Sequence, residues 1–213
     1  MRQVFQQSLR DVQNRLVEIA ELVEQSIDNA TQAFSGSDAS LAEQVIDAGE
    51  QIEQLAYELD QQTIDILALQ QPVASDLRLM VGALRMSSSL ERMADLAQHI
   101  AQLARYRYPE SAIPKGLGKT FVRMGALDVE MAQKLTELLR NQDEELIDEI
   151  RDLDDDLDKL HAKVFEKVLS DKVAENPVAV VDSTLASRYH ERFGDHAVSV
   201  AKQMRFFLSG SLD

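Results

Sequence analysis

Apolar residues recur every three or four positions along almost the whole chain, and this spacing is the strongest constraint on its fold. The first stripe runs from Leu9 to Phe34, and similar stripes cover 41–66, 121–138 and 146–164. Residues at this spacing share one face of an α-helix, whereas in a half-buried strand apolar and polar residues alternate. The chain has only 8 Gly and 4 Pro in 213 residues, so few positions interrupt a helix. We therefore predict six long helices and no strands.

Short polar or proline-containing segments separate the predicted helices. Residues 35–38 (Ser-Gly-Ser-Asp) end the first helix and cap the second, and 141–143 (Asn-Gln-Asp) form a turn and cap between the fourth and the fifth. Pro72 suits the first turn of the third helix, and Asn176, followed by a proline, opens the sixth. The clearest linker is 108–118, which contains two prolines and two glycines.

The sequence on the two sides of this linker is similar. Residues 190–201 (HERFGDHAVSVA) match 90–101 (LERMADLAQHIA) at a shift of 100, with Glu, Arg, Asp and two Ala in common. Residues 150–160 match 45–55 at a shift of 105. Two matches in the same order indicate an internal duplication of a three-helix unit.

The predicted fold class is therefore all-α, with six long helices arranged as two pseudo-symmetric antiparallel three-helix bundles. The first bundle spans 1–108 and the second spans 115–213. Four apolar residues are expected to be buried at equivalent places in the two bundles: Ile52, Leu55, Leu157 and Leu160.

Composition narrows the functions that the chain can have. The formal net charge of -15 disfavours nucleic-acid binding, which needs a positive field. The absence of Cys excludes thiolate metal sites and cysteine nucleophiles. No apolar run approaches the roughly 18 residues of a membrane span, and the N-terminus has no apolar signal-peptide core. We expect a soluble protein that meets a membrane only through its partners.

Pairs of carboxylates occur at helical spacing. Residues four apart share a helix face, and like charges there cost about 0.2–0.5 kcal/mol unless a cation neutralises them. If the fifth and sixth helices are neighbours, four carboxylates converge in an all-oxygen site of the kind that Mg²⁺, Mn²⁺, Ca²⁺ or Fe ions favour. The pairs are Glu91 with Asp95, Asp154 with Asp158, and Glu191 with Asp195.

The first bundle has an incomplete set of these acids. The position equivalent to Asp154 is Gly49 (154 - 105 = 49), and the next acid of the pair corresponds to Glu53. Three carboxylates would therefore form the first site, unless Asp47 or Glu50 substitutes from a neighbouring turn.

Other interpretations of the acidic pairs stay open. They can be a solvated face neutralised by Arg92 or Arg192, in a helical adaptor that binds no metal. They can also belong to a metal-dependent enzyme, although di-iron bundles use Glu-x-x-His motifs and the copies here read ERMAD and ERFGD. His190 and His196 flank the second pair; we interpret them as solvated, with support of metal ligands as the alternative.

Three segments of the sequence form a recognisable set: 72–78 (PVASDLR), 90–95 (LERMAD) and 190–197 (HERFGDHA). This set resembles the signature of the PhoU family, and the similarity extends over nearly the whole chain in order and length. The resemblance implies two three-helix bundles, a cytoplasmic location and a negative regulator of phosphate uptake and of the phosphate-starvation response. It implies two partners, the ATP-binding subunit of the phosphate ABC transporter and a membrane sensor histidine kinase.

The resemblance also implies metal ligands. Some family members bind multinuclear metal clusters through E/DxxxD pairs, which fall here on the three pairs above, while the remaining family pair falls on Gly49 and Glu53. The expected cofactors are di- or trivalent ions, namely Fe, Mn, Mg or Zn. We further expect a homodimer that is not an enzyme.

Overall fold

The structure, a computed structural model, describes residues 2–210, apart from the side chains of Arg2, Val4, Asp171 and Lys172. Within that range it contains helices and no strand, which confirms the all-α prediction. Six helices are long, as predicted, and a single turn, α6, was not foreseen. The helices are α1 (Arg2–Gly36), α2 (Ala39–Gln70), α3 (Ser75–Arg107), α4 (Gly118–Asn141), α5 (Glu145–Val168), α6 (Asp171–Ala174) and α7 (Pro177–Ser209).

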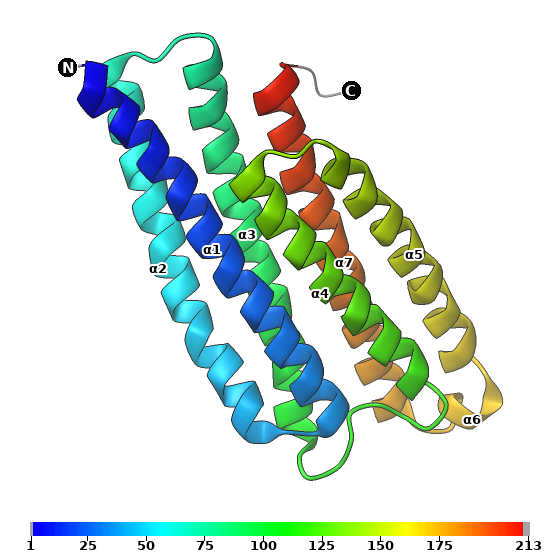
Figure 1. Cartoon of the computed structure of the whole chain (residues 1–213). Coiled ribbons are helices and arrows are strands. Elements are labelled where there is room, and N and C mark those ends of the chain that lie inside the picture. Colours follow the sequence, from blue (N-terminus) through cyan, green and yellow to red (C-terminus); the bar gives the residue numbers. More distant parts are fainter. Residues whose placement is uncertain (1, 211–213) are drawn as a thin grey trace.

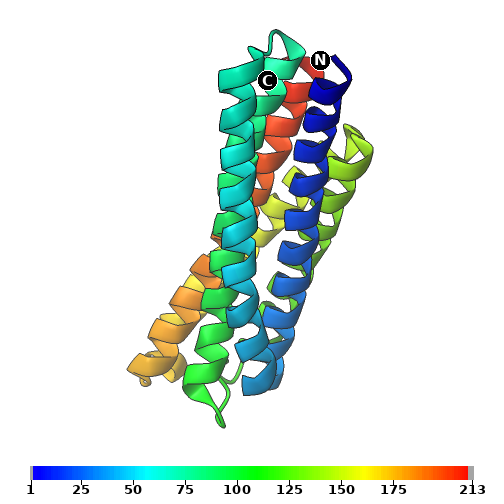
Figure 2. The same ribbon diagram turned by 90° about the vertical axis from the view of Figure 1, so that its left-hand side faces the viewer.

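The long helices run side by side, and each is antiparallel to the one before it (Figure 1). Helices α1, α3, α4 and α7 meet at the centre: α1 packs on α3 and α4, and α7 packs on α3 and α4. Helix α2 lies against α1 and α3, whereas α5 lies against α4 and α7. From the side, α1 and α2 lie in front, and α7 runs behind them from lower left to upper right (Figure 2). The two three-helix units therefore share a four-helix centre.

Two of the predicted helix caps are present. The Asp38 carboxylate accepts a hydrogen bond from the backbone N–H of Leu41 at 3.0 Å, which satisfies one of the free donors at the start of α2. Asn176 accepts from the N–H groups of Val178 and Ala179 at 3.1 and 3.2 Å at the start of α7. These short polar side chains fix where two of the long helices begin.

The position of Pro72 differs from the prediction. It lies in the connection between α2 and α3, three residues before the first helical residue, Ser75. The reason is local: Gln71 and Ala74 both have positive φ angles, 47° and 49°, so the backbone leaves the helical region on either side of the proline. The helix can begin only after Ala74.

Three of the four residues predicted for the core are buried. Ile52 and Leu157 are fully buried and Leu55 is 9% exposed. Leu160 is only partly buried, packed against the edge of the core. It lies three residues after Leu157, so its side chain is turned by about 60° from the buried face of α5 and meets solvent on one side.

We expect Leu157→Ala to destabilise the protein by about 2–5 kcal/mol, because a fully buried leucine loses its packing and leaves a cavity. Leu160→Ala is a matched control that removes the same atoms from a partly exposed position, and its loss should be clearly smaller. Urea denaturation of both variants measures the difference. Equal losses would mean that the burial of the two leucines does not differ.

A buried hydrogen-bonded pair interrupts the apolar core of the second unit. Asp128 on α4 and His190 on α7 are 0% and 1% exposed, and their Oδ2 and Nδ1 atoms are 2.5 Å apart. The rings of Phe34 and Phe121 lie beside the imidazole. Our interpretation of His190 as a solvated histidine is therefore wrong, because its partner comes from a helix that is distant in sequence.

An ion pair links the two units. The Arg107 guanidinium near the end of α3 donates to both carboxylate oxygens of Asp182 on α7, at 2.5 and 3.0 Å. Asp182 is buried and the Arg107 side chain is 38% exposed, so this bidentate contact is only partly shielded from water. It holds α3 and α7 in register near the linker.

Candidate functional site

The four acids predicted for the second bundle lie on two neighbouring helices, α5 and α7. Asp154 is half-buried between them, and its Oδ1 atom is buried without a hydrogen-bond partner. Glu191 likewise has a buried, unpartnered Oε2 atom. Asp158 and Asp195 are exposed at the rim. Two carboxylate oxygens are thus removed from water without a hydrogen bond in its place, and this costs folding free energy unless a proton or a cation is bound there.

Gly194 provides the space for the Asp154 carboxylate. A Cβ atom at this position would lie 2.4 Å from Asp154 Oδ1 and 2.9 Å from a methyl group of Leu157. A side chain on α7 would therefore push the carboxylate out of its place. The ERFGD motif has a glycine at this position because α5 approaches α7 too closely to leave room for a side chain.

The carboxylates perturb one another electrostatically. Burial, together with the neighbouring charges of Asp158 and Asp195, raises the pKa of Asp154 to about 7. Burial and Asp195 also raise the pKa of Glu191, against the opposing charge of Arg188, with which Glu191 forms an ion pair. The four predicted carboxylates of the second bundle therefore lie close enough to repel one another.

The donor chemistry of this cluster fits a hard cation, because all donors are oxygens and two of them are buried and unpaired. As the side chains lie, however, no three His, Asp or Glu residues within 2–210 are grouped closely enough to hold a metal ion. Carboxylates can shift one another's pKa over longer distances than metal binding allows, because the ligand oxygens must all lie within about 2.0–2.6 Å of the ion. Ligation would require these side chains to turn inward.

The first bundle is built differently around Gly49. A Cβ there would lie 1.9 Å from the amide nitrogen of Gln98, so the glutamine of α3 occupies the space of the missing carboxylate. At the position equivalent to Gly194, this bundle has Ala94 (194 - 100 = 94). The two units therefore differ at this place: Asp154 faces Gly194 in the second, whereas Gly49 faces the amide of Gln98 in the first.

The remaining acids of the first bundle are partly neutralised. Arg92 forms an ion pair with Asp95 at 2.8 Å, as the solvated-face interpretation expected, whereas Arg192 has no ion pair among the described residues. Burial, followed by Asp95, raises the pKa of Glu91, and Glu53 also contributes. Asp47 and Glu50, considered as substitutes, are exposed on α2.

Asp60 belongs to this group, and the sequence analysis missed it. Its Oδ1 atom is buried without a partner, burial raises its pKa, and its charge raises the pKa of Glu91. Asp60 lies seven residues after Glu53, two helical turns along the same face of α2. A search for acids at two-turn spacing, as well as one-turn spacing, would have found it.

The raised pKa of Asp154 gives a pH-dependent prediction for metal-free protein. The folded protein keeps a proton up to about pH 7 that the unfolded chain, with a pKa of 3.8, releases near pH 4. The stability from this group is present below pH 4 and is lost as the pH rises to about 7. Asp154→Asn cannot ionise, so at pH 8 with chelator it should be more stable than the parent by about 1–2 kcal/mol, a value reduced for solvent screening. Denaturation from pH 4 to 8 checks this, and parallel curves for the two proteins would contradict it.

No helix within residues 2–210 combines the length and apolar character that crossing a bilayer requires.

The fold and the acidic clusters together define a class: internally duplicated, all-α proteins whose two three-helix units each present carboxylates between neighbouring helices. The PhoU domain matches this chain twice, at residues 16–104 and 121–204. The chain belongs to the PhoU family.

Relatives of known sequence and structure match over nearly their full length. The phosphate-specific transport system accessory protein PhoU homolog 2 of Mycobacterium tuberculosis is 38% identical over 99% of this chain and 99% of its own. The crystal structure of PhoU from Pseudomonas aeruginosa has a TM-score of 0.90 and 29% identity, covering 97% of this chain and 100% of that one. The phosphate transport system regulatory protein PhoU from Streptococcus pneumoniae shares the fold, with a TM-score of 0.87 at 22% identity over 98% and 99%.

Proposed function

We propose that this chain is an accessory protein of a phosphate-specific transport system that restrains phosphate uptake and the phosphate-starvation response. The observation that carries the proposal is that both repeats match the PhoU domain and that 99% of the chain matches a protein named as a phosphate-specific transport system accessory protein. The protein acts in the cytoplasm by binding rather than by turnover. Its partners are the ATP-binding subunit of the phosphate ABC transporter and a membrane sensor histidine kinase, and it works as a homodimer.

Metal binding is the second part of the proposal. The acids between α5 and α7 hold one or more di- or trivalent ions, with Fe, Mn, Mg and Zn as candidates. Support comes from the buried, unpaired oxygens of Asp154 and Glu191 and from the pKa of about 7 for Asp154. A bound cation would offset the repulsion among these carboxylates and stabilise the fold by mass action.

Affinity capture tests the partners directly. The tagged chain is recovered from bacterial lysates grown at high and at low phosphate, and bound proteins are identified by mass. The transporter ATP-binding subunit and the kinase are expected, in amounts that differ between the two conditions. Capture of neither, from intact and folded bait, would contradict the proposed role. Asp154→Asn bait shows in parallel whether the acidic cluster contributes to partner binding.

A further inference from the structure

The four central helices create four grooves between neighbours, and the helices within residues 2–210 fill two of them. Helix α2 lies in the groove between α1 and α3, and α5 lies in the groove between α4 and α7. Within the described residues, no helix lies above the α1/α4 groove or the α3/α7 groove (Figure 1). The packing of α2 and α5 shows how a further helix would sit on a pair of antiparallel helices.

The α1/α4 groove is long enough to receive a helix. Three adjoining hollows of about 760, 600 and 280 Å³ lie along it, and they share lining residues such as Asp28 and Glu21. On α1 their lining runs from Gln13 to Ser35. That segment of 23 residues (35 - 13 + 1) is roughly 33 Å long, because each helical residue rises 1.5 Å. A partner helix of about 20 residues would fit along it.

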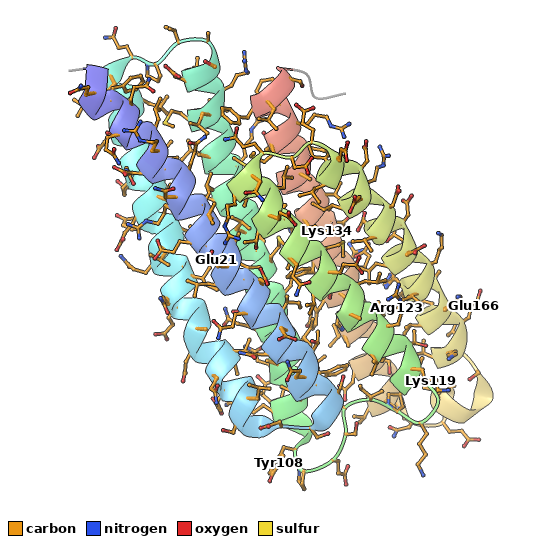
Figure 3. The ribbon with its side chains drawn as sticks, in the orientation of Figure 1. Glu21, Tyr108, Lys119, Arg123, Lys134 and Glu166 are labelled. Carbon is orange, nitrogen blue, oxygen red and sulfur yellow. The ribbon has the colours of Figure 1, made fainter. Side chains whose placement is uncertain are left out.

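The groove is strongly acidic. Its two cations are already engaged: Lys134 binds Glu149 of α5 at 2.6 Å, and Arg140 forms an ion pair with Glu21 across the groove. Figure 3 places Glu21 and Lys134 on the same face of the molecule. Six carboxylates against two cations leave four negative charges along the lining. The six are Glu18, Glu21, Glu24, Asp28, Glu130 and Glu137.

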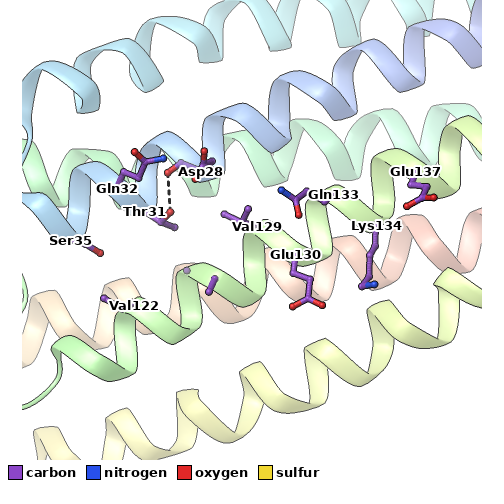
Figure 4. A pocket seen from close by; sticks show the side chains of 12 residues that line it. Asp28, Thr31, Gln32, Ser35, Val122, Val129, Glu130, Gln133, Lys134 and Glu137 are labelled. Atoms are coloured by element: carbon purple, nitrogen blue, oxygen red, sulfur yellow. Dashed lines mark hydrogen bonds between the residues drawn. The ribbon is translucent and has the colours of Figure 1, made fainter.

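A short apolar strip lies on the α4 side of the groove. It consists of Val122, which is 56% exposed, Ala126 and Val129. Figure 4 shows Val122 and Val129 on α4, with Gln133 further along the helix. At Gly125 the two helices approach closely, since a Cβ there would lie 2.8 Å from a methyl group of Thr31. The Thr31 hydroxyl donates to the Asp28 carbonyl at 2.9 Å and so turns its polar group back to its own helix. A short apolar strip flanked by acidic side chains suits a helix with an apolar stripe and basic flanks.

We propose that the α1/α4 groove is a docking site for a basic amphipathic α-helix of a protein partner. Charge complementarity selects this occupant over the same groove of a second copy, since the lining carries six carboxylates and two cations. The open α3/α7 groove differs, because Arg92 and Arg192 line it. The inference deepens the proposed function only in giving the accessory protein a surface for a partner, and it does not depend on metal.

A defined peptide tests the site. The probe is an 18-residue helix with leucines spaced by three and four and lysines elsewhere, and its scrambled sequence is the control. Because the chain has no cysteine, Gln32→Cys carries a fluorophore in the groove, and Asp65→Cys carries one on the exposed side of α2. Saturable binding of the amphipathic peptide with a signal at position 32 and none at 65 is expected.

Matched variants separate the groove from general acidity. Asp28→Lys with Glu137→Lys should weaken binding at least tenfold, whereas Asp65→Lys with Glu166→Lys, which changes the net charge equally on exposed faces of α2 and α5, should change it less than twofold. Ala126→Trp fills the hollow without changing the charge and should also weaken binding at least tenfold. Circular dichroism confirms that each variant is folded.

Three results would overturn the proposal: equal losses in both lysine pairs, equal binding of the scrambled peptide, or no saturable binding at millimolar peptide and low salt. Sedimentation adds a fourth, because a dimer dissociated by Ala126→Trp would make a second copy the occupant. The peptide assay contains no component of a phosphate system, so its failure leaves the capture experiment to decide the proposed function separately.

Discussion

Asp128→Val alone is expected to destabilise the protein by about 3–5 kcal/mol, because it leaves His190 buried with no partner for its Nδ1 atom. His190→Leu alone should cost a similar amount, since a carboxylate is then stranded among apolar side chains. Burial already raises the pKa of Asp128 to about 6, with His190 opposing that effect. Each group therefore depends on the other for its place in the core.

The double variant Asp128→Val with His190→Leu should recover most of that loss, to within about 1–2 kcal/mol of the parent protein. The first repeat provides the reason. The shift of 105 that relates 45–55 to 150–160 also relates the end of α1 at Gly36 to the end of α4 at Asn141, and at this shift Val23 corresponds to Asp128. Leu90 corresponds to His190 at the shift of 100, and both Val23 and Leu90 are buried. The same fold thus accepts an apolar pair at these two positions.

A double-mutant cycle by chemical denaturation measures this coupling. Removing both partners also removes the unpaired atoms Asp128 Oδ1 and His190 Nε2, which favours the double variant. If the double variant lost as much stability as the two single variants added together, the hydrogen bond between Asp128 and His190 would contribute nothing specific, and the comparison between the repeats would not hold.

Asp195→Ala is expected to weaken metal binding at least tenfold, and Asp95→Ala is expected to weaken it much less. Changes even to groups that support a ligand cost about 10–100-fold in affinity, so loss of a ligand should cost no less. The second bundle has the full set of four acids, whereas Gln98 fills the space beside Gly49 in the first. Titration of Mn²⁺ or Fe³⁺ into each variant, followed by calorimetry, measures the two losses.

Gly194→Ala tests the same cluster without removing an acid. The new Cβ would lie 2.4 Å from Asp154 Oδ1, so the carboxylate must move and metal affinity should fall. Gly118→Ala is the matched control, because nothing lies within 4 Å of a Cβ at that glycine. Equal losses in Asp95→Ala and Asp195→Ala would show that the two bundles bind alike, and no binding to the parent protein at millimolar metal would favour the solvated-face interpretation.

The helices could be predicted from sequence because each one satisfies a local rule. Asp38 and Asn176 cap the helices that follow them, and apolar stripes at three- and four-residue spacing mark the buried faces. Pro72 was misplaced because the helix start depends on the φ angles of Gln71 and Ala74, which composition does not reveal.

The polar interior could be predicted only in part, because its partners are distant in sequence. His190 looks solvated beside Glu191, yet its partner Asp128 is 62 residues away. A signal was present, since Asp128 lies on the apolar stripe of α4 between Met124 and Met131, where a charge must be buried. The difference at Gly49 was visible in the alignment of the repeats, but the role of Gln98 required the packing of α2 on α3.

The most direct test of the proposed regulatory role is the output of a phosphate-starvation reporter in a strain that lacks this chain and any paralogue, grown in phosphate-rich medium. The reporter should stay on, and the intact gene should switch it off again. A reporter that stays off after the deletion, as in the parent strain, would contradict the account.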